Sequence, residues 1–235
     1  MHVRTFIEEM ERLAPSVLAE DFDAQKIGLV VEGRQEISRI CCALDATPHV
    51  INKAVLASAD MLVVHHTPLW TPVTTVTGRV ADLMRALLSA DMNLYVMHTN
   101  FDRAPEGVND ALAELLSLRD ITPMTLGCIG TSMLSAAELS KRLGGHIRLW
   151  GEVKKLTRLA IVAGSGFDSA LMAEAKEKGA DVFLSSEMKH SVARMAPLPC
   201  IEATHYALEA PAMQRLATRR GWQYFDDPPF LKVIP

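Results

Sequence analysis

Residues 39–66 read RICCALDATPHVINKAVLASADMLVVHH, and this stretch decides the fold. An apolar run at 40–44 predicts a strand, a turn and a helix over about 48–57 follow, and a second apolar run at 61–64 predicts another strand. Continuous apolar strands separated by a helix are typical of a parallel βαβ unit whose sheet is covered on both faces. The second strand runs into two adjacent histidines, which therefore stand at the carboxyl end of the predicted sheet.

The same pattern returns over residues 158–190, RLAIVAGSGFDSALMAEAKEKGADVFLSSEMKH. Alignment of the Ala-Asp pair that precedes each second strand places Ser186 and Glu187 at the positions of His65 and His66. We interpret the chain as two related α/β lobes from an internal duplication. The alternative is that any two βαβ units look alike.

Each half then continues to a further strand that ends in a histidine followed, four residues later, by an acid. The first half has His98 and Asp102 in MHTNFD, and the second has His205 and Glu209 in THYALE. In a helix, residues four apart share a face, so this spacing lets imidazole and carboxylate act on one centre. Taken alone, either motif is a weak signal, and a histidine at a strand end is usually only hydrogen-bonded or solvated.

Length and composition limit the function classes. The 235 residues, 49% of them hydrophobic, suffice for one large domain or two modest ones. The turn-rich stretch 122–130 predicts a boundary, giving an N-terminal lobe of residues 1–121 and a C-terminal lobe of residues 122–235. With 24 basic against 28 acidic residues, the charge balance argues against nucleic acid and anionic membranes as partners.

Cysteine content and hydropathy predict the compartment. The four cysteines are too sparse for a disulfide framework, so a reducing environment fits. No uncharged run of 18 residues occurs, and we expect no membrane partner and a cytoplasmic protein.

The polar strand ends predict a metal site. Ligands of parallel sheets bind beyond the carboxyl ends of the strands, where the histidine and acid clusters of both halves fall. Imidazole nitrogens and carboxylate oxygens suit zinc, iron, manganese or nickel, and the mixture favours two ions over one. The Gly164-x-Gly166 turn lacks the third glycine of a dinucleotide motif, so we predict a tight turn there.

Four segments carry a family resemblance. ADMLVVHHTPLW, HTNFDRAPEGVNDALAELL, GADVFLSSEMKH and ATHYALEAPAMQRLA resemble, in order and spacing, the signature segments of the Nif-three-like family. Its members are often named GTP cyclohydrolase I type 2 homologues. The resemblance runs from about Gly28 to the C-terminus. It implies two α/β lobes facing each other across a dinuclear metal cleft, in a minimal form without an inserted domain, and a ring-shaped homohexamer.

Matching the family motifs to this chain also implies the ligands of two divalent metal ions. The residues carried over are His65, His66, Asp102, His205 and Glu209. Glu209 would bridge the metals, and His98 would line the same site.

These expectations leave several functions open. The leading hypothesis is a metal-dependent hydrolase of the GTP cyclohydrolase type, acting on a nucleotide or related small molecule through metal-activated water. His98 or Glu187 would carry protons in that reaction. The rival is a non-catalytic metal-binding hexameric scaffold or metallochaperone. A third interpretation, a ring threading nucleic acid, would need a basic cavity lined by residues such as Arg194, Arg219 and Arg220.

Overall fold

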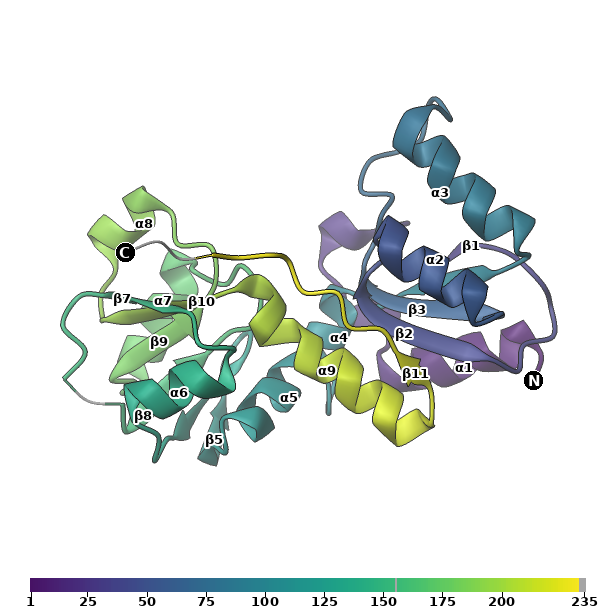
Figure 1. Cartoon of the computed structure of the whole chain (residues 1–235). Coiled ribbons are helices and arrows are strands. Elements are labelled where there is room, and N and C mark those ends of the chain that lie inside the picture. The colour runs from purple at the N-terminus through teal and green to yellow at the C-terminus, as the bar shows by residue number, and fades with distance from the viewer. Residues whose placement is uncertain (155, 233–235) are drawn as a thin grey trace. The chain divides into compact units, whose positions relative to one another are not determined.

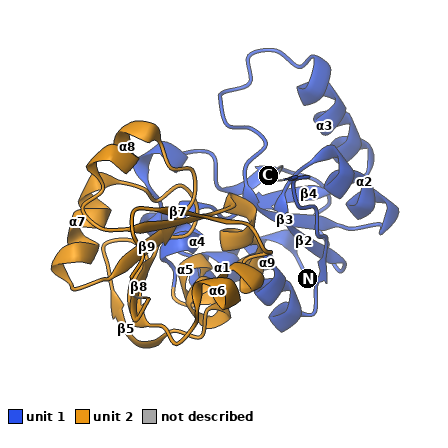
Figure 2. Cartoon of the chain, turned by 60° about the vertical axis from the view of Figure 1, so that its left-hand side comes forward, with its two compact units in different colours: residues 1–104, 213–235 blue, residues 105–212 orange. Residues whose placement is uncertain are grey.

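The structure is a computed structural model that describes residues 1–154 and 156–232 (Figure 1). Contacts divide the chain into two compact units, coloured separately in Figure 2. Unit 1 comprises residues 1–104 and the C-terminal segment from residue 213, and unit 2 comprises residues 105–212. The expected boundary after residue 121 falls inside unit 2, within a strand, and the C-terminal segment belongs to unit 1 because its short strand pairs there.

The sheet of unit 1 has the strand order β1-β4-β3-β2-β11. Strands β2, β3 and β4 are parallel neighbours, β11 lies parallel to β2, and β1 is antiparallel to β4. The strand bounds are Gly28–Val31 for β1, Ile40–Asp45 for β2, Met61–His66 for β3, Asn93–Val96 for β4 and Gln223–Tyr224 for β11. The parallel βαβ unit predicted from residues 39–66 is therefore present, and β3 includes both histidines.

Helices cover both faces of this sheet, α2 and α3 on one and α1 on the other (Figure 1). Phe6 of α1 is fully buried and meets the Tyr95 ring of β4 edge-on at 5.4 Å. Cys41 and Cys42, neighbours in β2, are both completely buried, which explains why the strand is apolar without alternation. The helix bounds are Val3–Leu13 for α1, Pro48–Leu56 for α2, Gly78–Ser89 for α3 and Thr99–Arg103 for α4, with 3-10 turns η1 at Ser16–Leu18 and η2 at Asp21–Asp23.

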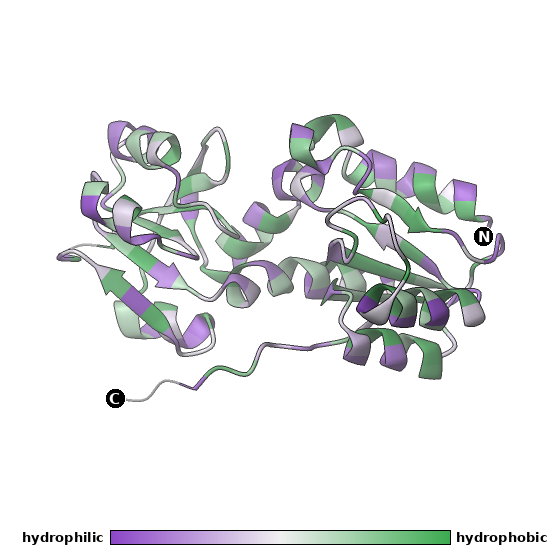
Figure 3. Cartoon of the chain, turned by 90° about the horizontal axis from the view of Figure 1, so that it is seen from above, coloured by the Kyte–Doolittle hydropathy of each residue, from purple (hydrophilic) through white to green (hydrophobic). Residues whose placement is uncertain are grey.

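The sheet of unit 2 has the order β5-β6-β8-β9-β10-β7, with β8, β9 and β10 parallel and β7 antiparallel to β10. The strand bounds are Arg119–Pro123 for β5, Cys128–Thr131 for β6, Ile147–Trp150 for β7, Arg158–Ile161 for β8, Val182–Ser185 for β9 and Cys200–Ala203 for β10. The helix bounds are Val108–Leu115 for α5, Ala136–Arg142 for α6, Ser169–Glu177 for α7 and His190–Met195 for α8. Helix α9, His205–Arg220, begins in unit 2 and passes into unit 1 at residue 213. In both units the central strands are mainly hydrophobic (Figure 3).

The two sheets share a core topology. In each, an antiparallel strand lies beside the last of three consecutive parallel strands: β1-β4-β3-β2 in unit 1 and β7-β10-β9-β8 in unit 2. In both units the same pair of hydrogen bonds, between an arginine and an aspartate, joins the start of the first parallel strand to the residue before the second. Asp60 N–H donates to Arg39 O at 2.8 Å and Arg39 N–H to Asp60 Oδ2 at 2.9 Å, while Asp181 and Arg158 exchange the same bonds at 2.7 and 2.9 Å. This equivalence favours internal duplication over chance likeness.

One local prediction is wrong. The stretch 122–130, predicted as a link, lies mostly in the hairpin of β5 and β6, with Gly127 at φ +75° in the turn. Asn109 lies within α5, whose N-cap is Gly107. The Asn109 side-chain oxygen accepts the N–H of Ala163 at 2.9 Å. None of the helices in the described part of the chain is long and apolar enough to cross a membrane.

Candidate metal centre

The structure brings the predicted site residues together in two groups, one in each unit. His65, His66, His98 and Asp102 belong to unit 1, whereas Glu187, His205 and Glu209 belong to unit 2.

The unit 1 group contains a histidine cluster at the carboxyl edge of the sheet. His65 and His66 are the last two residues of β3, and His98 follows β4 directly before α4. Each offers a ring nitrogen, and the three nitrogens lie within 4.8 Å of one another. The parallel pairing of β3 with β4 explains the convergence, because both strands end at the same edge.

His65 is held between two oxygens. Its ring is fully buried, and Nδ1 lies 2.7 Å from the carbonyl oxygen of Met97. A carbonyl can only accept, so Nδ1 carries a proton, and in a neutral ring Nε2 keeps its lone pair. Nε2 in turn faces Oδ1 of Asp102 at 3.5 Å. A cation held between this nitrogen and the carboxylate would satisfy both.

His66 and His98 are each oriented by a carboxylate. His66 Nδ1 lies 2.7 Å from Asp45 Oδ1, and His98 Nδ1 lies 2.9 and 3.0 Å from the two oxygens of Asp23. Histidines that bind metal through one nitrogen commonly donate the other N–H to such an oxygen, which fixes ring orientation and tautomer. Burial alone would raise the pKa of Asp23, but hydrogen bonds from Thr99 and His98 outweigh it and lower that pKa.

These two orienting carboxylates were missed from sequence. Asp45 closes β2 at the same sheet edge, so the strand-end rule applied to the histidines would have identified it. Asp23 lies in η2, 75 residues before His98 in the chain, and no local pattern links the two.

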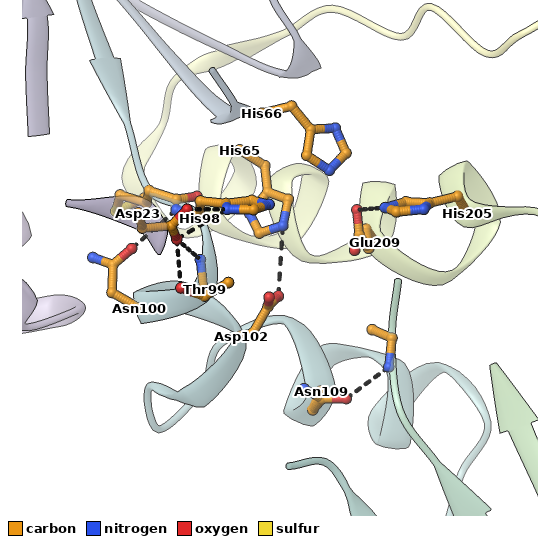
Figure 4. Close-up of polar contacts among 12 residues, drawn as sticks. Asp23, His65, His66, His98, Thr99, Asn100, Asp102, Asn109, His205 and Glu209 are labelled. Carbon is orange, nitrogen blue, oxygen red and sulfur yellow. Dashed lines mark hydrogen bonds and ion pairs between the residues drawn. The ribbon is translucent and has the colours of Figure 1, made fainter. Parts of the chain in front are cut away.

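The unit 2 group repeats the two-oxygen arrangement on a helix. His205 and Glu209 lie one turn apart at the start of α9, with Nε2 of the histidine 2.9 Å from Oε2 of the acid (Figure 4). The other nitrogen, Nδ1, lies 2.9 Å from Oε1 of Glu187, an exposed residue at φ +63°. Both ring nitrogens of His205 therefore face carboxylates, and a neutral ring can donate to only one of them.

A tight turn supports the Glu209 carboxylate. Gly164 adopts φ +69°, and a Cβ added there would overlap Oε1 of Glu209. The Gly164 carbonyl accepts from both the N–H and the hydroxyl of Ser186, at 3.0 and 2.6 Å. The predicted tight turn after β8 is present, and its close approach to Glu209 requires glycine.

Aromatic and cationic side chains flank His98. The Trp70 ring stands perpendicular to the imidazole with centroids 5.5 Å apart, and Phe22 lies 6.3 Å from it. The Lys26 ammonium lies 4.5 Å from the centroid of the Trp70 ring, and Trp70 is 49% exposed. Half-exposed aromatic rings beside polar groups are common at ligand-binding surfaces.

A cavity of about 530 Å³ lies beside His66 within unit 1. Its wall comes from the β2–α2 turn, the first half of α2, the last residue of β3 with the two residues that follow it, and the first three turns of α3. The volume lies within the range of about 300–1,000 Å³ that is typical of pockets for small molecules. The histidine cluster thus adjoins space for an organic ligand.

Comparisons with known proteins match nearly the whole chain. A family model described as Duf34/NIF3 (NGG1p interacting factor 3) matches residues 1–221. The GTP cyclohydrolase 1 type 2 homolog of Pyrococcus abyssi is 35% identical over 212 residues, covering 83% of this chain and 84% of that protein. The homolog of the same name from Streptomyces coelicolor is 33% identical over 254 residues, covering 92% and 87%.

A solved structure has the same fold as this chain. Reduced HcgD from Methanocaldococcus jannaschii superposes with a TM-score of 0.80 at 28% identity, covering 95% of this chain and 96% of that one.

Proposed function

This chain belongs to the Duf34/NIF3 family, and from that premise we propose that it is a dinuclear metal-dependent hydrolase acting on a nucleotide or a related small molecule. The family match confirms the resemblance inferred from the four sequence motifs. The name shared by the curated relatives, GTP cyclohydrolase 1 type 2 homolog, supplies the reaction class of the proposal.

One observation carries the proposal: His65 and His205 each direct both ring nitrogens at oxygen acceptors. A second proton on each ring would satisfy the oxygens, and so would a cation held between the ring nitrogen and the carboxylate. A divalent ion accepts several nitrogen and carboxylate lone pairs at once. The donor set of both units therefore fits metal.

The proposed ligands are those implied by the family motifs: His65, His66, Asp102, His205 and Glu209. Two bound ions of zinc, iron, manganese or nickel would lower the pKa of a bound water and offset negative charge developing on the substrate.

His98 is the leading candidate for proton transfer. The Asp23 carboxylate holds its Nδ1–H, so Nε2 can take up a proton while Asp23 stabilises the resulting imidazolium. Because Nε2 lies in the histidine cluster, His98 is also a candidate ligand. Glu187, exposed and bonded to His205, is the second candidate proton carrier.

The cavity beside His66 supports an enzyme over a non-catalytic metal scaffold or metallochaperone. A protein that only stores or delivers metal needs ligands but no adjoining space of about 530 Å³ for an organic molecule.

Single substitutions in each unit test the proposal. His66→Ala and Glu209→Ala should each abolish bound metal, measured by elemental analysis, and turnover on a panel of GTP, other nucleotides and phosphoesters. His49→Ala, which removes an exposed histidine of α2, is the matched control and should retain both. Full turnover by a metal-free variant would rule out the mechanism.

A further inference from the structure

We infer that the cavity beside His66 binds the body of a small organic anion, and that Arg79 pairs with the negative charge of that ligand. The inference deepens the proposed function, since the anion would be the substrate or product of the same site. Arg79 has no part in the proposed metal site.

The wall of the cavity is mainly apolar, which selects an organic body over a bare inorganic ion. Ile51 of α2 is buried, and Val80, Leu83 and Ala86 of α3 face the same space. Burying a flat or apolar group against such side chains removes it from water and favours binding.

The two acidic side chains of the wall already have partners within the protein. Asp45 accepts a hydrogen bond from His66, and Asp82 forms an ion pair with Arg85 at 2.8 Å. Arg79, exposed in the first turn of α3, makes no ion pair or hydrogen bond with any residue in the described ranges 1–154 and 156–232. A guanidinium stays protonated at all physiological pH values and pairs well with carboxylate or phosphate oxygens. Arg79 is therefore the charged side chain of the wall that is left to pair with a ligand.

The cavity shares wall residues with the histidine cluster. His66 and Asp45 line it, and the bond between them also sets the orientation of the His66 ring. A ligand in the cavity would thus lie against the strand end that carries the proposed metal ligands. The nearby N-terminus of α2 is already capped, because the Thr47 hydroxyl accepts the N–H of Val50 at 3.1 Å. Anion recognition accordingly rests on Arg79.

Two fluorescent probes of nearly equal shape test the inference on the full chain. 8-Anilinonaphthalene-1-sulfonate is an organic anion, and N-phenyl-1-naphthylamine is its uncharged counterpart. The unaltered protein should bind the anion roughly 5- to 10-fold more tightly than the neutral probe, as expected for one charge-assisted pair. Arg79→Gln should lower affinity for the anion to that of the neutral probe and leave the neutral probe unchanged.

A filling variant tests the place of binding. Asn52, an exposed residue of α2, lines the cavity, so Asn52→Trp should weaken both probes. Leu56 lies on the same helix, is 85% exposed and does not line the cavity, so Leu56→Trp should bind both probes as the unaltered chain does.

Unchanged anion binding in Arg79→Gln, unchanged binding of both probes in Asn52→Trp, or no probe binding by the unaltered chain would each overturn the inference. The amount of bound metal distinguishes failure of the anion-binding inference from failure of the proposed hydrolase function. None of these variants alters a proposed ligand, so each should bind as much metal as the unaltered chain. A chain that binds no metal but shows the predicted probe pattern would refute the hydrolase and leave the anion cavity intact.

Discussion

The Asp45 carboxylate sets the direction in which the His66 ring presents Nε2. Asp45→Ala should weaken metal binding by about 10- to 100-fold, as is usual when the hydrogen-bond acceptor behind a histidine ligand is lost. Asp45→Asn keeps an oxygen that can accept from Nδ1 and should restore much of that loss. Competition with a chromophoric chelator would measure both. Equal metal affinity of Asp45→Ala and the unaltered chain would show that the Asp45–His66 hydrogen bond plays no part in metal binding.

Gly164 offers a second test at the level of one residue. Gly164→Ala should displace the Glu209 carboxylate and reduce bound metal, because the new Cβ would overlap Oε1. Gly179→Ala is the matched control: it has φ +81° but no heavy atom within 4 Å of the added Cβ. Both should lose roughly 1 kcal/mol of stability through backbone strain, and only the first should lose metal. Elemental analysis measures the bound metal, and thermal unfolding measures the stability. Normal metal content in Gly164→Ala would contradict the close packing of Gly164 against the Glu209 carboxylate.

At the scale of single residues, the histidines of the site were predictable from the sequence, but most of the side chains that contact them were not. The strand-end rule identified His65, His66 and His98, which the fold gathers into one cluster. The Asp23 carboxylate was beyond such reasoning, because its contact with His98 exists only after the η2 turn packs against the end of β4. Trp70 was missed because an aromatic residue in a loop has no periodicity that marks it.

Asp60 closes the first βαβ unit. Its carboxylate accepts from the Ser38 N–H and hydroxyl, the Arg39 N–H and the Arg34 guanidinium, all at 2.8–2.9 Å. Asp60→Asn should lower the free energy of unfolding by roughly 2–3 kcal/mol, since charged hydrogen bonds are lost around a buried group. Asp181→Asn, at the equivalent place in unit 2, removes fewer such bonds and should cost about 1 kcal/mol. Urea unfolding compares the two, and a larger loss at Asp181 would contradict this ranking.

The same carboxylate predicts a pH dependence. Burial alone would raise the pKa of Asp60, but hydrogen bonds from Arg39 and Ser38 and the charge of Arg34 lower it below 3.8. A carboxyl whose pKa is lower in the folded state stabilises the fold above its unfolded pKa and loses that effect as pH falls through the folded value. The stability difference between the unaltered chain and Asp60→Asn should thus shrink on acidification below pH 3.8. Urea unfolding at stepped pH measures it; a constant difference would contradict the assignment.

Secondary structure was predictable where strands are buried on both faces. Such strands give uninterrupted apolar runs, and β2 and β3 were identified for that reason. The hairpin of β5 and β6 was mistaken for a link because β5 is exposed along its whole length and has the composition of a loop. β11 consists of only Gln223 and Tyr224, too short to carry a pattern, and its pairing with β2 explains the return of the C-terminal segment to unit 1.

At the scale of the whole molecule, the family resemblance leads us to propose a homohexamer. Size-exclusion chromatography with light scattering should give a mass near that of six 25.8 kDa chains. Metal-free and metal-loaded samples should be compared, because an ion that binds the assembled form more tightly than the monomer would stabilise the assembly. A protein that remains monomeric in both states would contradict the hexamer while leaving the ligand set of each unit in place.

Metal content and catalysis measured on one sample test the central claim most directly. The full chain, purified without chelators, would be analysed for elements and assayed against GTP and a panel of nucleotides and phosphoesters. We predict about two divalent ions per chain and a turnover that a chelator removes and added metal restores. Bound metal with no turnover on any panel member would favour the metal scaffold over the hydrolase. A chain that binds no metal would contradict the account of the histidines that end β3.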